Sequence, residues 1–356
     1  MNHWTQIKEK LEAFGIDAIL LTSRPNRFYA SGFPSSDGIA FLTGTDSIFA
    51  TDSRYTEAAS RCISGAKVEE LPRGVSYVQM VDDLVRRYGV KRLGFEEDAM
   101  TVGEYQRYEN RLPCALVPAQ AVLKELRAAK SGEELALMRQ AQEIAERALA
   151  DVLPQIKPGV SELDLAAELT YRMMRHGAGG NSFDPIVVSG PNSSLPHGVP
   201  TSRKIQSGEF VTMDFGCVYG GYCSDMTRTV AVQHADDEMR QVYQLVLRAQ
   251  EAGIAAARAG IPGKEIDEAA RAVIRQGGYG PCFGHGFGHS LGIEIHESPN
   301  LNVSGTNPLP VGAVVSAEPG IYLPGRFGVR IEDVLYLKED GCENLTRAPK
   351  ELLILE

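Results

Sequence analysis

Residues 208–232 read GEFVTMDFGCVYGGYCSDMTRTVAV, and apolar and polar side chains alternate on both sides of Gly220-Gly221. Alternation with a period of two is typical of strands, and paired glycines are typical of tight hairpin turns. The stretch therefore predicts a β-hairpin. Asp214 and Asp225 lie at nearly equal distances from the turn, so they should be roughly opposite one another. Because residues opposite in a hairpin share a face, we expect the two carboxylates to converge.

A second stretch repeats this pattern. Residues 313–337 read AVVSAEPGIYLPGRFGVRIEDVLYL, with a predicted turn at Pro324-Gly325. Glu318 and Glu332 are equidistant from Gly325. The sequence thus predicts two hairpins, and each of them carries one pair of acidic side chains.

The helices before the hairpins repeat as well. PGVSELDLAA at 158–167 resembles PGKEIDEAA at 262–270, and each begins an amphipathic helix that ends in glycine, at Gly177 and at Gly277. The same spacing of roughly a hundred residues separates the acidic pairs, since 318 − 214 = 104 and 332 − 225 = 107. We infer two half-domains related by pseudo-twofold symmetry, with four acids meeting between them.

Four buried carboxylates repel one another and are costly to desolvate. They can stay together by protonation, by pairing with a cationic side chain such as Arg228 or Arg330, or by binding metal. A structural ion-pair network is therefore the alternative to a metal site.

A glycine-rich stretch favours metal. Residues 282–299 read CFGHGFGHSLGIEIHESP, with three of the seven histidines of the chain, His285, His289 and His296. An ion-pair network leaves these imidazoles without a role, unless the stretch is simply a flexible loop. Carboxylates and one imidazole suit two divalent ions such as Mn²⁺, Fe²⁺, Co²⁺ or Zn²⁺, and the sequence does not choose among these metals.

The composition narrows the class of protein. Hydrophobic residues make up 43% of the chain and charged residues 23%, as in soluble globular proteins. The net charge of −10 disfavours nucleic acid and anionic membranes as partners. The six cysteines form no CxxC pair, and no export signal or membrane-spanning run is evident. We expect a soluble protein of the cytoplasm.

The chain is long enough for two domains. Short apolar runs bounded by turn residues alternate with helical periodicity in the first part, which predicts an α/β domain with a mixed sheet over residues 1–125. Ser131 and Glu134 form a capping box that predicts the start of a long helix. The second domain, with α+β architecture and internal pseudo-twofold symmetry, is expected over residues 126–356.

Four blocks resemble the metallopeptidases of the pita-bread fold, which include methionine aminopeptidase, prolidase and aminopeptidase P. The blocks are MDFG…SDMTRT, HGFGHSLGIEIHE, SAEPGIY and VRIEDV, in the order and approximate spacing of that family. The segments LTSRPNRFYASGFPSSDGIAFL and TDSRYTEAA resemble the creatinase-type domain that precedes the catalytic half of prolidases and aminopeptidases P. The resemblance implies a pita-bread catalytic domain and peptide substrates of the Xaa-Pro type.

The resemblance also implies roles for individual residues. It implies a dinuclear site, with Mn²⁺ the first choice and Co²⁺, Fe²⁺ or Zn²⁺ as alternatives, that activates a water. The implied metal ligands are Asp214, Asp225, His289, Glu318 and Glu332, with Glu318 also the general base. His197 in SSLPHGVP and His296 are implied to be catalytic residues that contact substrate and transition state, and His285 and Arg330 are implied to bind substrate in the pocket. Arg330 could instead be only an ion-pair partner of the acids.

Several readings stay open at this point. The implied partners are short peptides with proline at the second position, and the implied assembly is a homodimer. A methionine-type or broader aminopeptidase would use the same layout, creatinase would work without metal, and a non-catalytic pita-bread module would bind partners only. The sequence does not decide between dipeptidase and aminopeptidase, because the wall that would exclude longer peptides is not apparent in it.

Overall fold

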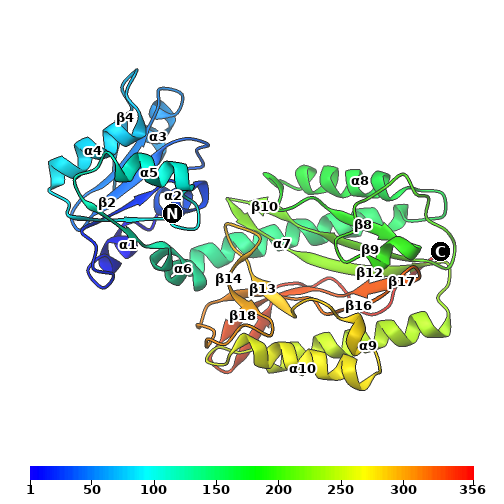
Figure 1. Ribbon diagram of the computed structural model, residues 1–356. Helices are drawn as coiled ribbons and strands as arrows, with labels where there is room; N and C mark the ends of the chain where they lie inside the picture. The colour runs from blue at the N-terminus through cyan, green and yellow to red at the C-terminus, as the bar shows by residue number, and fades with distance from the viewer. The chain divides into compact units, whose positions relative to one another are not determined.

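A computed structural model describes residues 1–356 (Figure 1). The chain forms two compact units, Met1–Arg127 and Ala128–Glu356. The boundary falls within helix α6 (Gln120–Ala128), two residues beyond the position expected from the sequence. No helix combines the length and the apolar character needed to cross a membrane.

The first unit is built on a six-stranded mixed sheet in the order β4-β3-β2-β1-β5-β6. The pairs β1–β2 and β2–β3 are antiparallel, whereas β3–β4, β1–β5 and β5–β6 are parallel. The three central strands are buried along their whole length, which explains their short apolar runs. The strands are β1 (Ala18–Leu21), β2 (Ile39–Thr43), β3 (Ser47–Thr51), β4 (Lys67–Glu70), β5 (Arg92–Phe95) and β6 (Ala115–Pro118). The helices before α6 are α1 (Trp4–Lys10), α2 (Arg24–Ser31), α3 (Thr56–Cys62), α4 (Tyr77–Tyr88) and α5 (Val102–Glu109).

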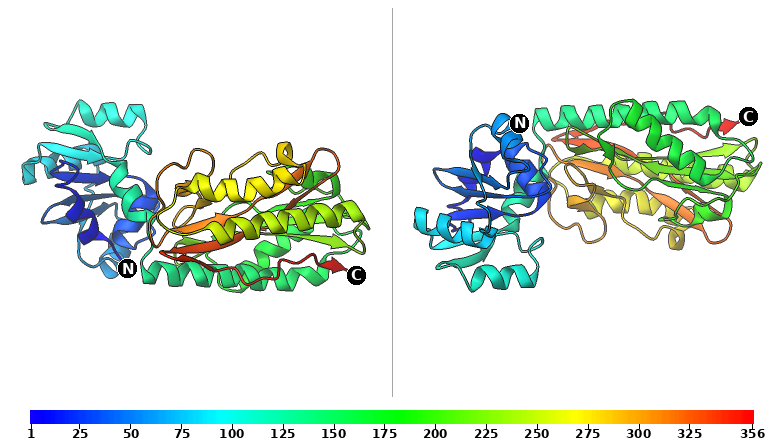
Figure 2. Two further views of the ribbon diagram at one scale, coloured as in Figure 1. Left: turned by 90° about the horizontal axis from the view of Figure 1, so that it is seen from below. Right: turned by 90° about the horizontal axis from the view of Figure 1, so that it is seen from above.

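The second unit consists of two halves with the same order of elements. Each half has two helices followed by three antiparallel strands, β8–β9–β12 in the first and β13–β15–β18 in the second. Figures 1 and 2 show the strands of both halves between the two helix pairs. The first half contains α7 (Gly132–Val152), α8 (Glu162–Arg175), β8 (Ile186–Ser189), β9 (Phe210–Phe215) and β12 (Met226–Val232). The second contains α9 (Asp237–Ala256), α10 (Gly263–Gln276), β13 (Gly288–Ser290), β15 (Val314–Ala317) and β18 (Asp333–Lys338).

Shorter elements complete this unit. The hairpin extensions are β10 (Cys217–Tyr219) with β11 (Tyr222–Cys223), and β16 (Gly320–Leu323) with β17 (Phe327–Arg330). The remaining elements are β7 (Gly180–Asn181), β14 (Glu297–Leu301), β19 (Gly341–Asn344), β20 (Ile354–Leu355), η1 (Leu153–Gln155), η2 (Gly190–Ser194) and η3 (Gly280–Cys282).

Local signals explain where the principal helices begin. Ser131 caps α7 and Ser161 caps α8, and each forms the full capping box with the acid three residues later. The glycines expected at the helix ends follow closely, with Gly177 one residue beyond the C-cap of α8 and Gly277 at the C-cap of α10.

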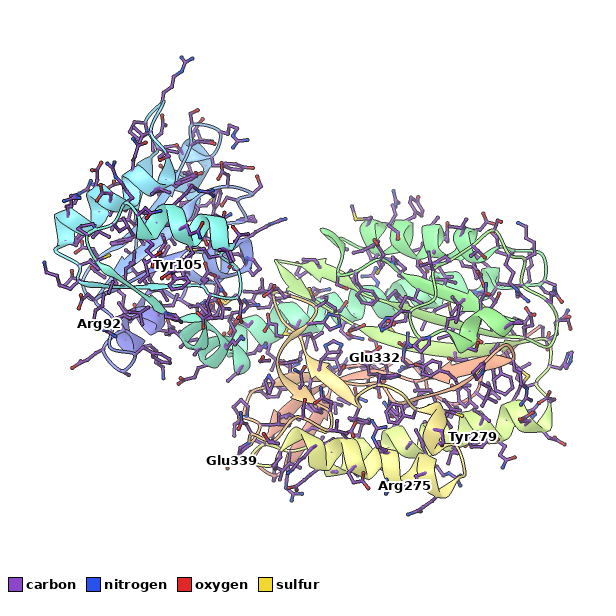
Figure 3. All side chains as sticks on the ribbon, in the orientation of Figure 1. Arg92, Tyr105, Arg275, Tyr279, Glu332 and Glu339 are labelled. Carbon is purple, nitrogen blue, oxygen red and sulfur yellow. The ribbon has the colours of Figure 1, made fainter.

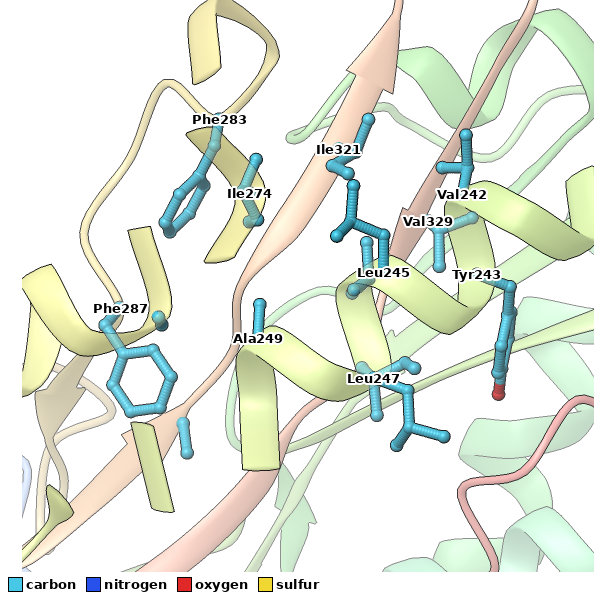
Figure 4. Close-up of a cluster of buried hydrophobic side chains, with 14 of the residues drawn as sticks. Val242, Tyr243, Leu245, Leu247, Ala249, Ile274, Phe283, Phe287, Ile321 and Val329 are labelled. Atoms are coloured by element: carbon cyan, nitrogen blue, oxygen red, sulfur yellow. The ribbon is translucent and has the colours of Figure 1, made fainter. Parts of the chain in front are cut away.

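Two hydrophobic cores fill this unit, and strands β9 and β12 contribute side chains to both. In the second half, the buried faces of α9 and α10 pack on the strands, and Phe283 and Phe287 fill the space between them (Figure 4). Phe287 packs so closely on Gly253 of α9 that a Cβ there would lie 2.2 Å from the ring. This contact fixes the histidine-rich stretch on the helix beneath it.

Candidate active site

The first predicted hairpin forms with the predicted turn, since Gly220 and Gly221 both have positive φ, 55° and 87°. The register differs slightly from the expectation, because Asp214 lies opposite Thr227 rather than Asp225. Asp225 precedes Thr227 by two residues, which places both on the same face of a strand. The two aspartates accordingly line one cavity.

The second hairpin has the register expected for its acids. Ala317 pairs with Asp333 and, beyond a short interruption, Gly320 pairs with Arg330. The β15–β18 and β16–β17 pairs share the same register, so position 318 lies across from position 332. Glu318 and Glu332 line the same cavity as the aspartates, and Figure 3 shows Glu332 between the strands of the two halves.

His289 joins the two halves of the acid cluster. Its Nε2 lies 3.6 Å from Asp225 Oδ2 and 3.3 Å from Glu318 Oε1. Ser316 supports this arrangement, because its hydroxyl accepts from the His289 amide (3.0 Å) and donates to Glu318 Oε1 (3.0 Å). Asp225, His289 and Glu332 offer ligand atoms that lie within 4.8 Å of one another.

Ion pairing with lysine or arginine accounts for only one of the four acids. Arg330 Nη2 lies 2.5 Å from Asp214 Oδ2, whereas Arg228 pairs with Asp333 at 2.9 Å. Neither Lys nor Arg forms an ion pair with Asp225, Glu318 or Glu332. An ion-pair network therefore does not explain the cluster.

Three carboxylate oxygens in the cluster are buried and have no hydrogen-bond donor, namely Asp214 Oδ1, Asp225 Oδ1 and Glu332 Oε1. Burial, reinforced by neighbouring carboxylates, raises the pKa of Asp225 and of Glu332 well above the usual carboxyl range. Buried acceptors without donors are expensive unless a proton or a cation satisfies them. An oxygen-rich set with one imidazole nitrogen is a suitable donor set for divalent ions.

His289 and Glu318 have opposite pKa shifts. Burial acts to lower the pKa of His289, but the hydrogen bond and the charge of Glu318 outweigh it and raise that pKa to about 9. Burial acts to raise the pKa of Glu318, but His289 outweighs it and that pKa falls. Without a metal ion, a protonated His289 is the counter-ion of Glu318, so a metal at His289 must displace a proton.

A cavity of about 430 Å³ opens onto the acid cluster. His296 borders His289, with ring centroids 4.4 Å apart, and burial lowers its pKa. Every predicted site residue lines this cavity, namely His197, Asp214, Asp225, His285, His289, His296, Glu318, Arg330 and Glu332. The other lining residues are Phe183, Asp184, Ile186, Pro196, Gly286, Gly288, Ile295, Asn300 and Asn302.

Arg330 and His285 are connected through a residue that the sequence did not single out. Tyr322 OH lies 2.7 Å from Arg330 Nη1 and 2.9 Å from His285 Nε2. His285 Nδ1 lies 2.9 Å from the carbonyl of Gly286, so this nitrogen carries the proton and Nε2 accepts from Tyr322. Burial lowers the pKa of His285, which favours this neutral form.

Thr227 is a second residue that the sequence did not single out. Its hydroxyl donates to Glu332 Oε2 (2.7 Å) and accepts from Arg330 Nε (3.1 Å). Thr227 thus links the acid of one half to the strand of the other. Both Thr227 and Tyr322 lie inside quoted motifs, two residues after Asp225 and four after Glu318, and that proximity was the available signal.

Two family models match the chain. The model described as Metallopeptidase family M24 matches residues 136–339, and the model described as Creatinase/Prolidase N-terminal domain matches residues 4–129. The first match includes every residue that lines the cavity.

Similar proteins cover nearly the whole length of the chain. An uncharacterized peptidase of Bacillus subtilis, YqhT, is 46% identical over 342 residues, 96% of each chain. The structure of an Xaa-Pro dipeptidase from Bacillus anthracis has a TM-score of 0.95 at 39% identity and covers 99% of both chains. The structure of an X-Pro aminopeptidase from Thermotoga maritima has a TM-score of 0.92 at 36% identity, covering 98% of this chain and all of that one.

Proposed function

The chain belongs to metallopeptidase family M24, and on this premise we propose that it hydrolyses Xaa-Pro bonds at the amino end of short peptides. The observation that carries the proposal is the set of donor-free carboxylate oxygens that converge with His289 at a cavity large enough for a small peptide. The names of the relatives from Bacillus anthracis and Thermotoga maritima support proline as the second residue.

Five side chains would hold two divalent ions, with Mn²⁺ our first choice. These are Asp214, Asp225, His289, Glu318 and Glu332. When bound, the ions would supply Lewis acidity that acidifies a water and polarises the scissile carbonyl. The buried carboxylates would compensate the positive charge, and Thr227 would hold Glu332 in its orientation.

Glu318 is the group that we assign as general base. Its side chain is 18% exposed, more than that of Asp225 or Asp214, so it meets water in the cavity. The Ser316 hydroxyl donates to Glu318 Oε1 (3.0 Å), which orients the carboxylate that would accept a proton from a water in the cavity. The water proton would pass to Glu318 and then to the proline nitrogen that leaves.

The histidines have separate roles in this proposal. His197 and His296 are both exposed at the cavity, and we assign to them hydrogen bonds to the substrate and to the developing oxyanion. Both ring nitrogens of His285 already have partners, so His285 would shape the pocket rather than donate a proton. Arg330, anchored on Asp214 and Tyr322, would hold His285 in place.

Proline fits this kind of site for a chemical reason. A proline nitrogen in a peptide bond has no hydrogen, so a peptidase that binds that N–H loses a contact. A site that relies on cations and on apolar walls loses nothing. Phe183, Ile186 and Ile295 supply apolar lining for the proline ring.

The test is turnover by the purified protein loaded with Mn²⁺. We expect hydrolysis of Ala-Pro and Met-Pro peptides, little turnover of Met-Ala, and loss of activity on removal of metal by a chelator. Preference for Met-Ala would favour a methionine-type aminopeptidase, and no hydrolysis at all would favour a binding module. Comparing Ala-Pro with Ala-Pro-Ala separates dipeptidase from aminopeptidase. Sedimentation tests the homodimer that we also propose.

A further inference from the structure

A buried ion pair lies behind the histidines of the cavity. Lys130 Nζ is 3.1 Å from Glu297 Oε2, and the two side chains are only 2% and 5% exposed. Neither residue lines the cavity. Burying two charges is costly, and apolar side chains of the same size would often serve stability as well. The pair is therefore a candidate for a role beyond stability.

Glu297 closes the segment that carries His296. Ser290 of β13 pairs with Glu297 of β14, so residues 291–296 form a loop with its base at this pair. The Glu297 carboxylate also reaches into the loop, since its Oε1 accepts from the Glu294 amide (3.1 Å). Neighbouring side chains in a strand point to opposite faces. His296 is exposed at the cavity, whereas Glu297 is turned toward Lys130.

Lys130 is fixed at both of its ends. Its amide donates to the carbonyl of Gly312 (2.8 Å), and Gly312 in turn donates to Leu337 of β18 (3.0 Å). Its ammonium group reaches Glu297. The side chain thus connects the base of the histidine loop to the ladder β15–β18, which also carries the flanks of Glu318 and Glu332.

Gly292, in the loop 291–296, packs directly against the ion pair. A Cβ at Gly292 would lie 2.9 Å from both Lys130 Cε and Glu297 Oε2. The carbonyl of Gly292 accepts from the Cys223 amide (2.7 Å), which ties the loop to the strand just before Asp225. Gly292 therefore leaves room for the ion pair while its backbone is held on the other half of the unit.

From these contacts we propose that Lys130 and Glu297 are positioning residues, which set the place of His296 relative to the acid cluster. They touch neither substrate nor metal and act through the loop 291–296. This inference rests on the proposed function for its effect on turnover, but not for its effect on the loop. The substrate-contacting role of His296 would depend on a charge pair behind it.

The experiment compares Lys130→Met and Glu297→Gln with the unmodified chain, all loaded with Mn²⁺. Both variants should keep their metal content and lose about 10-fold or more in kcat/KM for Ala-Pro peptides. Hydrogen exchange over residues 291–297 should become faster in both. Arg139→Met, which removes the ion pair between Arg139 of α7 and Glu343 of β19, is the control and should change neither quantity.

Two further measurements test whether Lys130 and Glu297 act through His296. In a His296→Ala background, Lys130→Met should cause no additional loss, because the pair acts only through His296. Equal losses with and without His296 would overturn the proposal and leave a purely structural pair. Unchanged exchange over 291–297 would overturn it even if the unmodified chain cleaved no peptide, so the two proposals can fail separately.

Discussion

At the scale of single residues, the site is defined by polar atoms that lack partners. Most buried polar groups in proteins have hydrogen bonds. Here, three carboxylate oxygens of residues that line one cavity have none, although Thr227 and Arg330 donate to the second oxygens of Glu332 and Asp214. The unsatisfied oxygens therefore mark the place that a cation would occupy.

Asp225→Asn should affect the stability of the metal-free and the metal-loaded protein differently. Without metal, the change replaces a carboxyl group that must either hold a proton or repel its neighbours by a neutral amide, so it should raise the midpoint of thermal unfolding. With Mn²⁺ present, the variant should gain no stability and show at least about 100-fold lower turnover. Calorimetry with and without Mn²⁺ measures the first effect. Destabilisation of the metal-free variant would mean that the carboxylate is satisfied within the protein.

We expect Tyr322→Phe to lower turnover without loss of bound metal. The change leaves Arg330 and His285 each short of one hydrogen bond in a buried place, at a cost of about 1–3 kcal/mol. Turnover should fall while the metal content stays the same. Tyr105→Phe removes a hydroxyl from an exposed helix and is the matched control. Equal stability and turnover in both variants would contradict the role of the Tyr322 hydroxyl.

At the scale of elements, sequence periodicity predicts the hairpins and the capped helices of the second unit. These features depend on neighbours in the chain, as with Ser131 at the start of α7. The sequence predicts the register of the first hairpin less accurately. Paired glycines locate a turn to within a residue, and one residue changes which side chains face each other. Asp214 consequently faces Thr227.

Helix α2 shows what periodicity cannot predict. Its buried face includes Asn26 and Arg27, so its pattern does not look amphipathic. The reason lies about seventy residues away, where the buried Glu96 accepts from Asn26 Nδ2 (2.6 Å) and from Ser23 Oγ (2.5 Å). A polar partner that distant in sequence leaves no local signal. The same holds for the contacts of Tyr322 and Thr227 in the site.

Gly253→Ala tests how an element supports the site. Helix propensity alone favours alanine by about 1 kcal/mol. The new methyl group would instead collide with Phe287, at 2.2 Å, so we expect a loss of about 1–3 kcal/mol and weaker metal binding. Gly132→Ala, where nothing lies within 4 Å, should be neutral or slightly stabilising. Urea unfolding of both variants measures the contrast, and a stabilised Gly253→Ala would contradict the packing described.

At the scale of the whole molecule, the predicted fold class is confirmed. The creatinase-type unit has its mixed sheet, and the M24 unit has two halves with matching helices and strands. The repeated pattern of helices and hairpins in the sequence was sufficient to predict the two halves, because duplication places equivalent acids on equivalent strands. No sequence pattern marks the residues that would exclude longer peptides, so turnover measurements distinguish a dipeptidase from an aminopeptidase.

The stability of the whole protein should depend on pH in a way set by the cluster. The raised pKa of Asp225 and of Glu332 means that the folded metal-free chain holds protons that the unfolded chain releases above a pH of about 4. His289 changes the unfolding free energy in the same direction. Its contribution to stability is fully present below about pH 6.5 and is lost as the pH rises through its folded-state pKa of about 9. The unfolding free energy of the metal-free protein should therefore fall as pH rises.

Metal replaces these protons, so Mn²⁺ should stabilise the protein more at pH 8 than at pH 6. The difference should be up to about 1.4 kcal/mol per pH unit for each proton displaced. Chemical unfolding at both pH values, with and without Mn²⁺, measures it. An equal gain at the two pH values would show that binding displaces no proton from the cluster.

The central claim is that both halves of the second unit jointly hold a pair of divalent ions on which hydrolysis depends. The most direct measurement is a titration of metal-free protein with Mn²⁺, following bound metal by elemental analysis and Ala-Pro cleavage in the same samples. We predict that activity rises from zero and levels off as two ions per chain are bound. Full activity in samples without bound transition metal would contradict the claim.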